Sequence, residues 1–163
     1  GIGVSQAVKI YKRYGDAAVA VLRDNPYRLA EDISGIAFKS ADSIAEKLGI
    51  AKDSPKRLAA GLLHVLQQAA TEGHVYLPVE DLFAHAAELL EADAAALEGP
   101  LRDLLERGQA VRDGAAVYLP YLHVAETGCA TLLKRLIRTR PDRVSIKTDK
   151  DIEWVARKQK IQL

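Results

Sequence analysis

Two glycine-containing turns, each followed at once by a helical pattern, carry the residues best suited to chemistry in this sequence. The stretch GIGVSQAVKIYKRYG begins at Gly1, and GIAFKSADSIAEKLG begins at Gly35. A glycine turn lets the backbone approach a ligand closely, because no Cβ stands in the way. The helix that follows offers unpaired N–H groups and the positive end of its dipole, which together favour an anion such as phosphate. The two stretches align without a gap, with identities at Gly1/Gly35, Ile2/Ile36, Ala7/Ala41, Ile10/Ile44 and Gly15/Gly49.

The candidate phosphate-binding residues lie in these turns and in the helices that follow them. Ammonium groups add positive charge, and we expect Lys9 and Lys12 beside the first turn and Lys39 beside the second. Such a site holds DNA by its phosphates and is indifferent to base sequence. The alternative is that the glycines only allow close helix packing. The residues predicted to bind DNA are Gly1, Gly3, Ser5, Lys9, Lys12, Gly35, Ala37, Lys39 and Ser40.

The rest of the sequence offers no catalytic, cofactor-binding or metal-binding residue. A nucleotide-binding loop needs Gly-Lys-Ser/Thr at the start of a helix, and none of the eleven glycines precedes a lysine. The four histidines, His64, His74, His85 and His123, lack the spacing of metal ligands. His64 is instead expected to be a partly buried structural residue. The fragment is therefore expected to do no chemistry alone.

Composition indicates a globular chain from a reducing compartment. The chain has 163 residues, 48% of them hydrophobic, and contains no apolar run of the length that spans a membrane. A lone Cys129 cannot form an internal disulfide, which predicts a cytoplasmic location. Cys129 lies in a helical pattern, and we expect it to be a small buried hydrophobic residue.

Charge is distributed unevenly along the chain. Residues 73–133 hold three Lys/Arg against ten Asp/Glu, a net charge of −7, whereas residues 134–163 have a net charge of +6. Because like charges repel, a polyanion should avoid the middle of the chain and favour its two ends.

The hydrophobic periodicity predicts a mainly α fold: a tandem helix-hairpin-helix domain over 1–72, a winged-helix-like domain over 73–137, and a basic linker with a short helix over 138–163. In the first domain, a long helix carries the apolar stripe Leu58, Leu62, Leu66 and Ala69. In the second, a strand and two helices precede a small β-hairpin around Asp113-Gly114. Because the winged-helix-like domain is acidic, we expect it to pack against other protein elements or contact a protein, and not to bind DNA.

These residues carry a resemblance to a known family. The run from KIYKRYG to IAEKLGI, with NPYRL inside it and GHVYLP after it, resembles the N-terminal region of bacterial RecD-like superfamily 1 DNA helicases, relatives of the exodeoxyribonuclease V alpha subunit. The resemblance implies a non-catalytic DNA-binding and positioning fragment of an ATP-dependent 5′–3′ helicase that acts in recombination and repair. It also implies single-stranded or forked DNA and the helicase motor domains as partners. ATP and magnesium would then belong to that motor core, and no membrane is involved.

Two departures from the family qualify the resemblance. The family usually has glycine where this chain has Ala37, and we expect Gly3 to supply an unusual backbone conformation that Ala37 supplies less well. The first hairpin is therefore expected to contribute more to DNA binding than the second. The chain begins at what resembles a late hairpin, so earlier hairpins of the parent are expected to precede it. The rival interpretation is a protein-interaction or structural module whose hairpins serve helix packing only.

Overall fold

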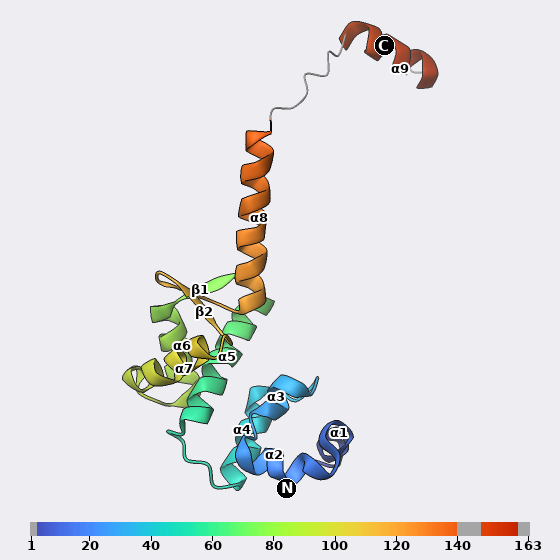
Figure 1. The fold of residues 1–163 in the computed structure, drawn as a ribbon. Coiled ribbons are helices and arrows are strands. Elements are labelled where there is room, and N and C mark those ends of the chain that lie inside the picture. The colour runs from blue at the N-terminus through green and yellow to red at the C-terminus, as the bar shows by residue number, and fades with distance from the viewer. Residues whose placement is uncertain (1–2, 140–147, 160–163) are drawn as a thin grey trace. The chain divides into compact units, whose positions relative to one another are not determined.

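The computed structural model describes residues 3–139 and 148–159 (Figure 1). The chain forms two compact units, Gly1–Thr127 and Gly128–Leu163. The described part is mainly helical and carries one small antiparallel sheet, as predicted. The predicted domain limits at residues 72 and 137 stay predictions.

Five short helical segments and the longer helix α5 open the first unit. Glycines with positive φ follow both α1 and α4: Gly15 (φ 54°) is the C-cap of α1, and Gly49 (φ 79°) comes one residue after Leu48, the C-cap of α4. Pro55 begins the next helix, where a missing N–H is not needed. The segments are α1 (Val4–Tyr14), η1 (Gly15–Ala17), α2 (Ala18–Asp24), α3 (Arg28–Asp32), α4 (Phe38–Lys47) and α5 (Pro55–Thr71).

The three strands form a sheet of order β1-β3-β2, with antiparallel pairs throughout. Val117 at its centre pairs with Leu77 on one side and Arg112 on the other. The predicted hairpin is therefore correct, and Gly114 supplies its positive φ of 59°. Pro100 lies in the first turn of a helix, where proline is tolerated. The elements are β1 (Tyr76–Pro78), α6 (Val79–Leu90), η2 (Ala94–Leu97), α7 (Glu98–Glu106), β2 (Val111–Asp113) and β3 (Ala116–Tyr118).

The long helix α5 lies at the centre of the first unit, with α1–α4 near its amino-terminal half and α6 and α7 packed against it (Figure 1). Its predicted apolar stripe is buried throughout, at Leu58, Leu62, Leu66 and Ala69. The stripe joins a core that runs from Ile10 to Leu119. Burial of such side chains contributes about 1.5–3 kcal/mol each, so α5 is the main packing element of the unit.

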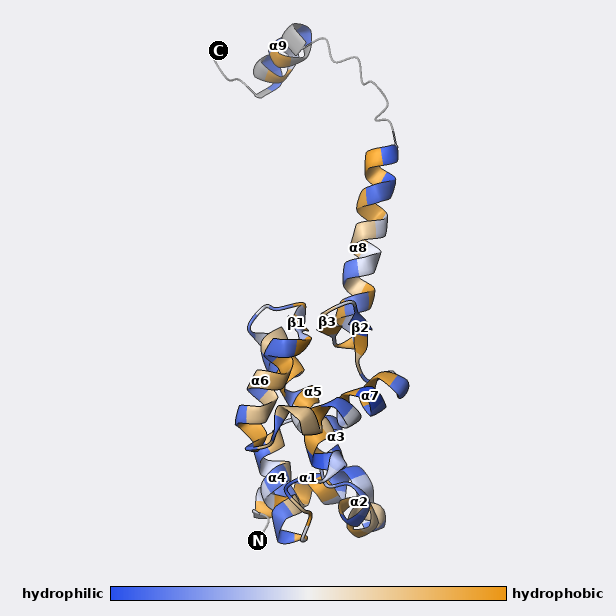
Figure 2. Ribbon diagram, turned by 90° about the vertical axis from the view of Figure 1, so that its left-hand side faces the viewer, coloured by the Kyte–Doolittle hydropathy of each residue, from blue (hydrophilic) through white to orange (hydrophobic). Residues whose placement is uncertain are grey.

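Helix α8 (Pro120–Arg138) begins in the first unit and continues into the second, which also contains α9 (Thr148–Gln159). Bands of hydrophobic and hydrophilic residues alternate along α8 (Figure 2). Cys129 is exposed, so the prediction that it is buried was wrong: the described residues place no packing partner over its helix face. Part of the predicted linker is helical, since α9 begins at Thr148; residues 140–147 lie outside the described residues. No helix in the described ranges is long and apolar enough to cross a bilayer.

Candidate nucleic-acid interface

The starts of α1 and α4 have the same local structure. Their N-cap residues, Gly3 (φ −62°, ψ 146°) and Ala37 (φ −83°, ψ 164°), are both extended, and neither helix has a side-chain cap. The first helical bonds run from Ala7 N to Gly3 O (2.9 Å) and from Ala41 N to Ala37 O (3.2 Å). No acidic residue lies in either first turn. Both helices therefore present first-turn N–H groups and a positive dipole end with no carboxylate beside them.

The expected conformational difference between Gly3 and Ala37 was wrong. Both residues have the extended backbone that is usual before a helix and that any L-residue can adopt. The conformation that favours glycine occurs two residues earlier in the second repeat, at Gly35, where φ is +83°. Alanine at position 37 therefore causes no backbone strain in the second hairpin. The position that favours glycine is Gly35, in the turn before the helix.

Lys9 lies at the second hairpin, although it belongs to the helix of the first repeat. Its Nζ donates a hydrogen bond to the carbonyl oxygen of Ser34 at 3.2 Å. A Cβ built on Gly35 would lie 2.8 Å from the same Nζ. The side chain is exposed, so its ammonium group is accessible to solvent beside the turn. The prediction that Lys9 adds its charge beside the first hairpin is therefore wrong, because its ammonium group lies beside the second.

The remaining predicted site residues occupy the two helix starts and their neighbourhood. Lys39 is exposed in the first turn of α4, and Ser40 is half-buried next to it. Ser5 and Lys12 are exposed on α1. Gly1 lies outside the described residues. The predicted set thus divides between two helix starts, of which the second has two lysines close to it.

The end of α1 is fixed to α3 by a polar cluster around Asp32. The Tyr14 hydroxyl donates to Asp32 Oδ2 at 2.6 Å, and the guanidinium groups of Arg13 and Arg28 lie 3.8 and 3.5 Å from the same carboxylate. Burial and the bond to Asp32 raise the pKa of Tyr14 to about 12. Two of the cations near the hairpins are therefore engaged by an internal carboxylate, whereas Lys12 has no ion pair among the described residues.

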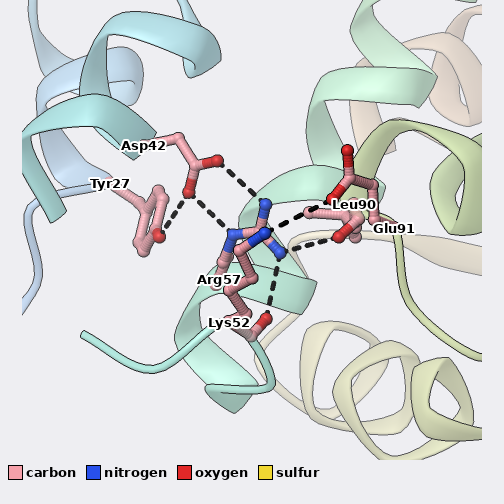
Figure 3. A network of polar contacts seen from close by, with 6 residues as sticks. All are labelled: Tyr27, Asp42, Lys52, Arg57, Leu90 and Glu91. Carbon is pink, nitrogen blue, oxygen red and sulfur yellow. Dashed lines mark hydrogen bonds and ion pairs between the residues drawn. The ribbon is translucent and has the colours of Figure 1, made fainter. Parts of the chain in front are cut away.

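A second polar cluster holds α4 from behind, with Arg57 of α5 at its centre (Figure 3). Arg57 binds the Asp42 carboxylate with two nitrogens, at 2.8 and 3.0 Å, and donates to the carbonyl oxygens of Lys52 (3.0 Å) and Leu90 (2.9 Å). The Tyr27 hydroxyl also donates to Asp42, at 2.8 Å. Burial disfavours the Asp42 carboxylate, but the bonds from Arg57 and Tyr27 outweigh this effect and lower its pKa. Arg57 thus joins α4 to α5 and to the last residue of α6.

Three rings stack behind the start of α4. Phe38, its first residue, lies between Tyr27 (centroids 5.8 Å apart) and His64 (5.4 Å). Burial, with a smaller contribution from the charge of Lys39, lowers the pKa of His64. The prediction that His64 is a partly buried structural residue is confirmed. Together, the ring stack and the Arg57 cluster fix the amino-terminal end of α4 against α5.

The sequence did not predict the two polar clusters, nor that Lys9 of α1 lies beside the second hairpin. Tyr27, Asp42 and Arg57 are separated by 15 residues at each step, and Lys9 and Ser34 by 25. Polar residues at such separations carry no periodic signal, so only the folded chain brings them together. Among residues 3–139 and 148–159, no group of three or more His, Cys, Asp or Glu is placed to hold a metal ion.

Helix α3, the turn through Gly35 and helix α4 make a complete helix-hairpin-helix unit, and α1 repeats its second helix. The fold and site therefore define a protein with a helix-hairpin-helix domain. Residues 1–76 match the family model described as the ATP-dependent RecD2 DNA helicase HHH domain. Residues 1–76 are thus similar to that domain, and the resemblance to the N-terminal region of RecD-like helicases is confirmed.

The similarity extends beyond the matched domain. An ATP-dependent RecD2 DNA helicase of Deinococcus radiodurans is 30% identical over 155 residues, which cover 86% of this chain and 22% of that protein. The chain thus spans about a fifth of the length of this relative. The winged-helix assignment of the elements after α5 stays a prediction.

Proposed function

We propose that the helix-hairpin-helix domain binds single-stranded or forked DNA through its phosphates, without regard to base sequence. In this proposal it positions the strand for the motor of an ATP-dependent 5′–3′ helicase in recombination and repair. The motor domains, with their ATP and magnesium ion, would lie outside these 163 residues. The family of residues 1–76 and the name of the Deinococcus relative support the proposal.

The observation that carries the proposal is the position of the Lys9 ammonium group. It lies beside the Gly35 turn, where the next helix, α4, starts without a side-chain cap and carries Lys39 in its first turn. A phosphate at this point would meet backbone N–H groups, the positive end of the α4 dipole and two ammonium groups. These are the components of a sequence-independent anion site, because none of them reads a base edge.

The rival function, a module in which the hairpins serve packing only, also has an observation in its favour. Lys9 already has an acceptor within the protein, the carbonyl oxygen of Ser34, so it can act as a link between α1 and the second hairpin. The two functions differ in what removal of this lysine changes. A packing link affects the melting temperature alone, whereas a phosphate ligand affects DNA affinity and its salt dependence.

The test is fluorescence anisotropy with a labelled dT20 strand and a labelled fork, titrated between about 50 and 200 mM salt. Lys9→Glu is expected to weaken binding to both probes and to reduce the salt slope by about one unit. Lys12→Glu should have a smaller effect, because Lys12 is not at the complete second hairpin. Lys47→Glu is the matched control, since Lys47 lies at the opposite end of α4.

The variants must melt within a few degrees of the parent chain for this comparison to address binding. Equal DNA affinity and equal salt slope for Lys9→Glu and Lys47→Glu would refute the proposal and favour the packing function. A strong preference among mixed-sequence strands would also contradict it, because phosphate contacts carry no base information.

A further inference from the structure

A groove between α6 and α7 combines an apolar floor with a cationic rim. Its volume is about 390 Å³. The floor consists of Val79 and Phe83 from α6 and Leu101 and Leu105 from α7. Leu101 is buried, whereas the other three are half-buried and therefore leave apolar surface open to a ligand. Arg102 of α7 and Arg112 of β2 lie on the rim.

The two arginines are unusual for their part of the chain. Residues 73–133 contain only three Lys/Arg, namely Arg102, Arg107 and Arg112, among ten Asp/Glu, and two of the three line this groove. Neither makes an ion pair among the described residues. Arg112 uses its Nε for the carbonyl oxygen of Gly114 at 2.9 Å, and both side chains are exposed. Their terminal nitrogens are thus free to bind a carboxylate in the bidentate manner typical of arginine.

We propose that this groove binds a short acidic peptide segment of a partner protein, with an apolar side chain on the floor and carboxylates on Arg102 and Arg112. The floor supplies apolar area, and the two guanidinium groups select the charge and orientation of the segment. Glu98 also lines the groove and disfavours a denser run of carboxylates. The occupant is therefore a segment in which acidic and apolar residues alternate.

The surrounding charge favours a peptide over DNA. A DNA strand would carry its phosphates beyond the groove into a segment with a net charge of −7, where repulsion opposes binding. A short peptide needs only the two arginines that the groove provides. The proposal does not depend on the hairpins, because the groove lies on other elements.

The experiment uses the 163-residue chain and fluorescein-labelled peptides in an anisotropy titration. The probe has the sequence GSDLDFSG; one control peptide, GSNLNFSG, lacks its charges, and another, GSDSDSSG, lacks its apolar side chains. We expect binding of the probe and at least about tenfold weaker binding of each control, which corresponds to the loss of one charged or apolar contact. These comparisons use the unaltered chain, so they do not depend on the folding of a variant.

Variants then locate the site. Arg102→Glu and Arg112→Glu should each weaken the probe about tenfold. Arg107→Glu is the matched control, because Arg107 follows the same helix but does not line the groove. Absence of probe binding, equal binding of the three peptides, or an equal loss with Arg107→Glu would overturn the proposal. So would the finding that Arg102→Glu and Arg112→Glu abolish binding of dT20 and leave the probe unaffected, since the groove would then be a DNA site.

Discussion

Replacement of Gly35 by alanine tests the geometry of the second hairpin most directly, with Gly3→Ala as its matched control. The two glycines occupy different positions of the repeated turn, the first position at Gly35 and the third at Gly3, and their backbones differ: φ is +83° at Gly35 and −62° at Gly3. A Cβ at Gly3 would have ordinary contacts, the nearest being Gln6 Oε1 at 3.8 Å. At Gly35 it would lie 2.8 Å from Lys9 Nζ, so that ammonium group must move.

The expected difference in the free energy of unfolding follows from these numbers. An L-residue with left-handed φ costs about 1–2 kcal/mol. Displacement of the Lys9 ammonium adds little, because the side chain is flexible and its bond to Ser34 is exposed. The lower entropy of the unfolded chain stabilises both alanine variants by about 0.4–1 kcal/mol, so this effect cancels in the comparison. Gly35→Ala should therefore be about 1–2 kcal/mol less stable than Gly3→Ala.

The assay is thermal melting followed by far-UV circular dichroism, supported by urea denaturation at 25 °C. For a chain of this size, the difference corresponds to a melting temperature lower by about 2–8 °C. Equal stability of the two variants would refute the assignment of the left-handed turn to Gly35. Lower stability of Gly3→Ala would refute the claim that its extended backbone needs no glycine.

Three further predictions concern the packing behind the hairpin. Arg57→Met should lower the free energy of unfolding by about 3 kcal/mol in urea denaturation, because it leaves the Asp42 carboxylate without its bidentate partner; a loss below about 1 kcal/mol would contradict the role of this cluster. His64→Gln should reduce the loss of stability between pH 7 and 5: the folded-state pKa of this histidine is lowered, so the unfolded chain binds the proton more readily as pH falls below about 6.5, and an unchanged pH profile would argue against this. Gly61→Ala should destabilise by about 1–3 kcal/mol, because its Cβ would lie 2.6 Å from a leucine side chain of α6, whereas Gly99→Ala meets open space and should be neutral or slightly stabilising; similar melting of the two would contradict the close packing of α5 and α6.

Local patterns in the sequence predicted most of the secondary structure correctly. The stripe on α5, the hairpin at Asp113-Gly114 and the closure of both repeats by glycine depend on residues a few positions apart, so spacing alone indicates them. A helix directly after each glycine turn was also predicted in this way, and the structure begins these helices at Val4 and Phe38. The sequence did not predict that Gly3 and Ala37 have the same backbone conformation, because a glycine in a motif does not reveal which position takes a positive φ.

The sequence by itself determined the repeat, the helical periodicity, the acidic middle of the chain and the absence of a Gly-Lys-Ser/Thr loop. Only the tertiary structure decided that Lys9 lies at the second hairpin, that Arg57 joins α4 to the end of α6, and that Cys129 is exposed. The physical reason is that helix periodicity and turn chemistry act over a few residues, whereas charge pairing and burial depend on which distant segments the fold brings together. A lysine has the same local pattern whether it is solvated or bonded 25 residues away, and its role is settled by the carbonyl group that the packed chain places within its reach.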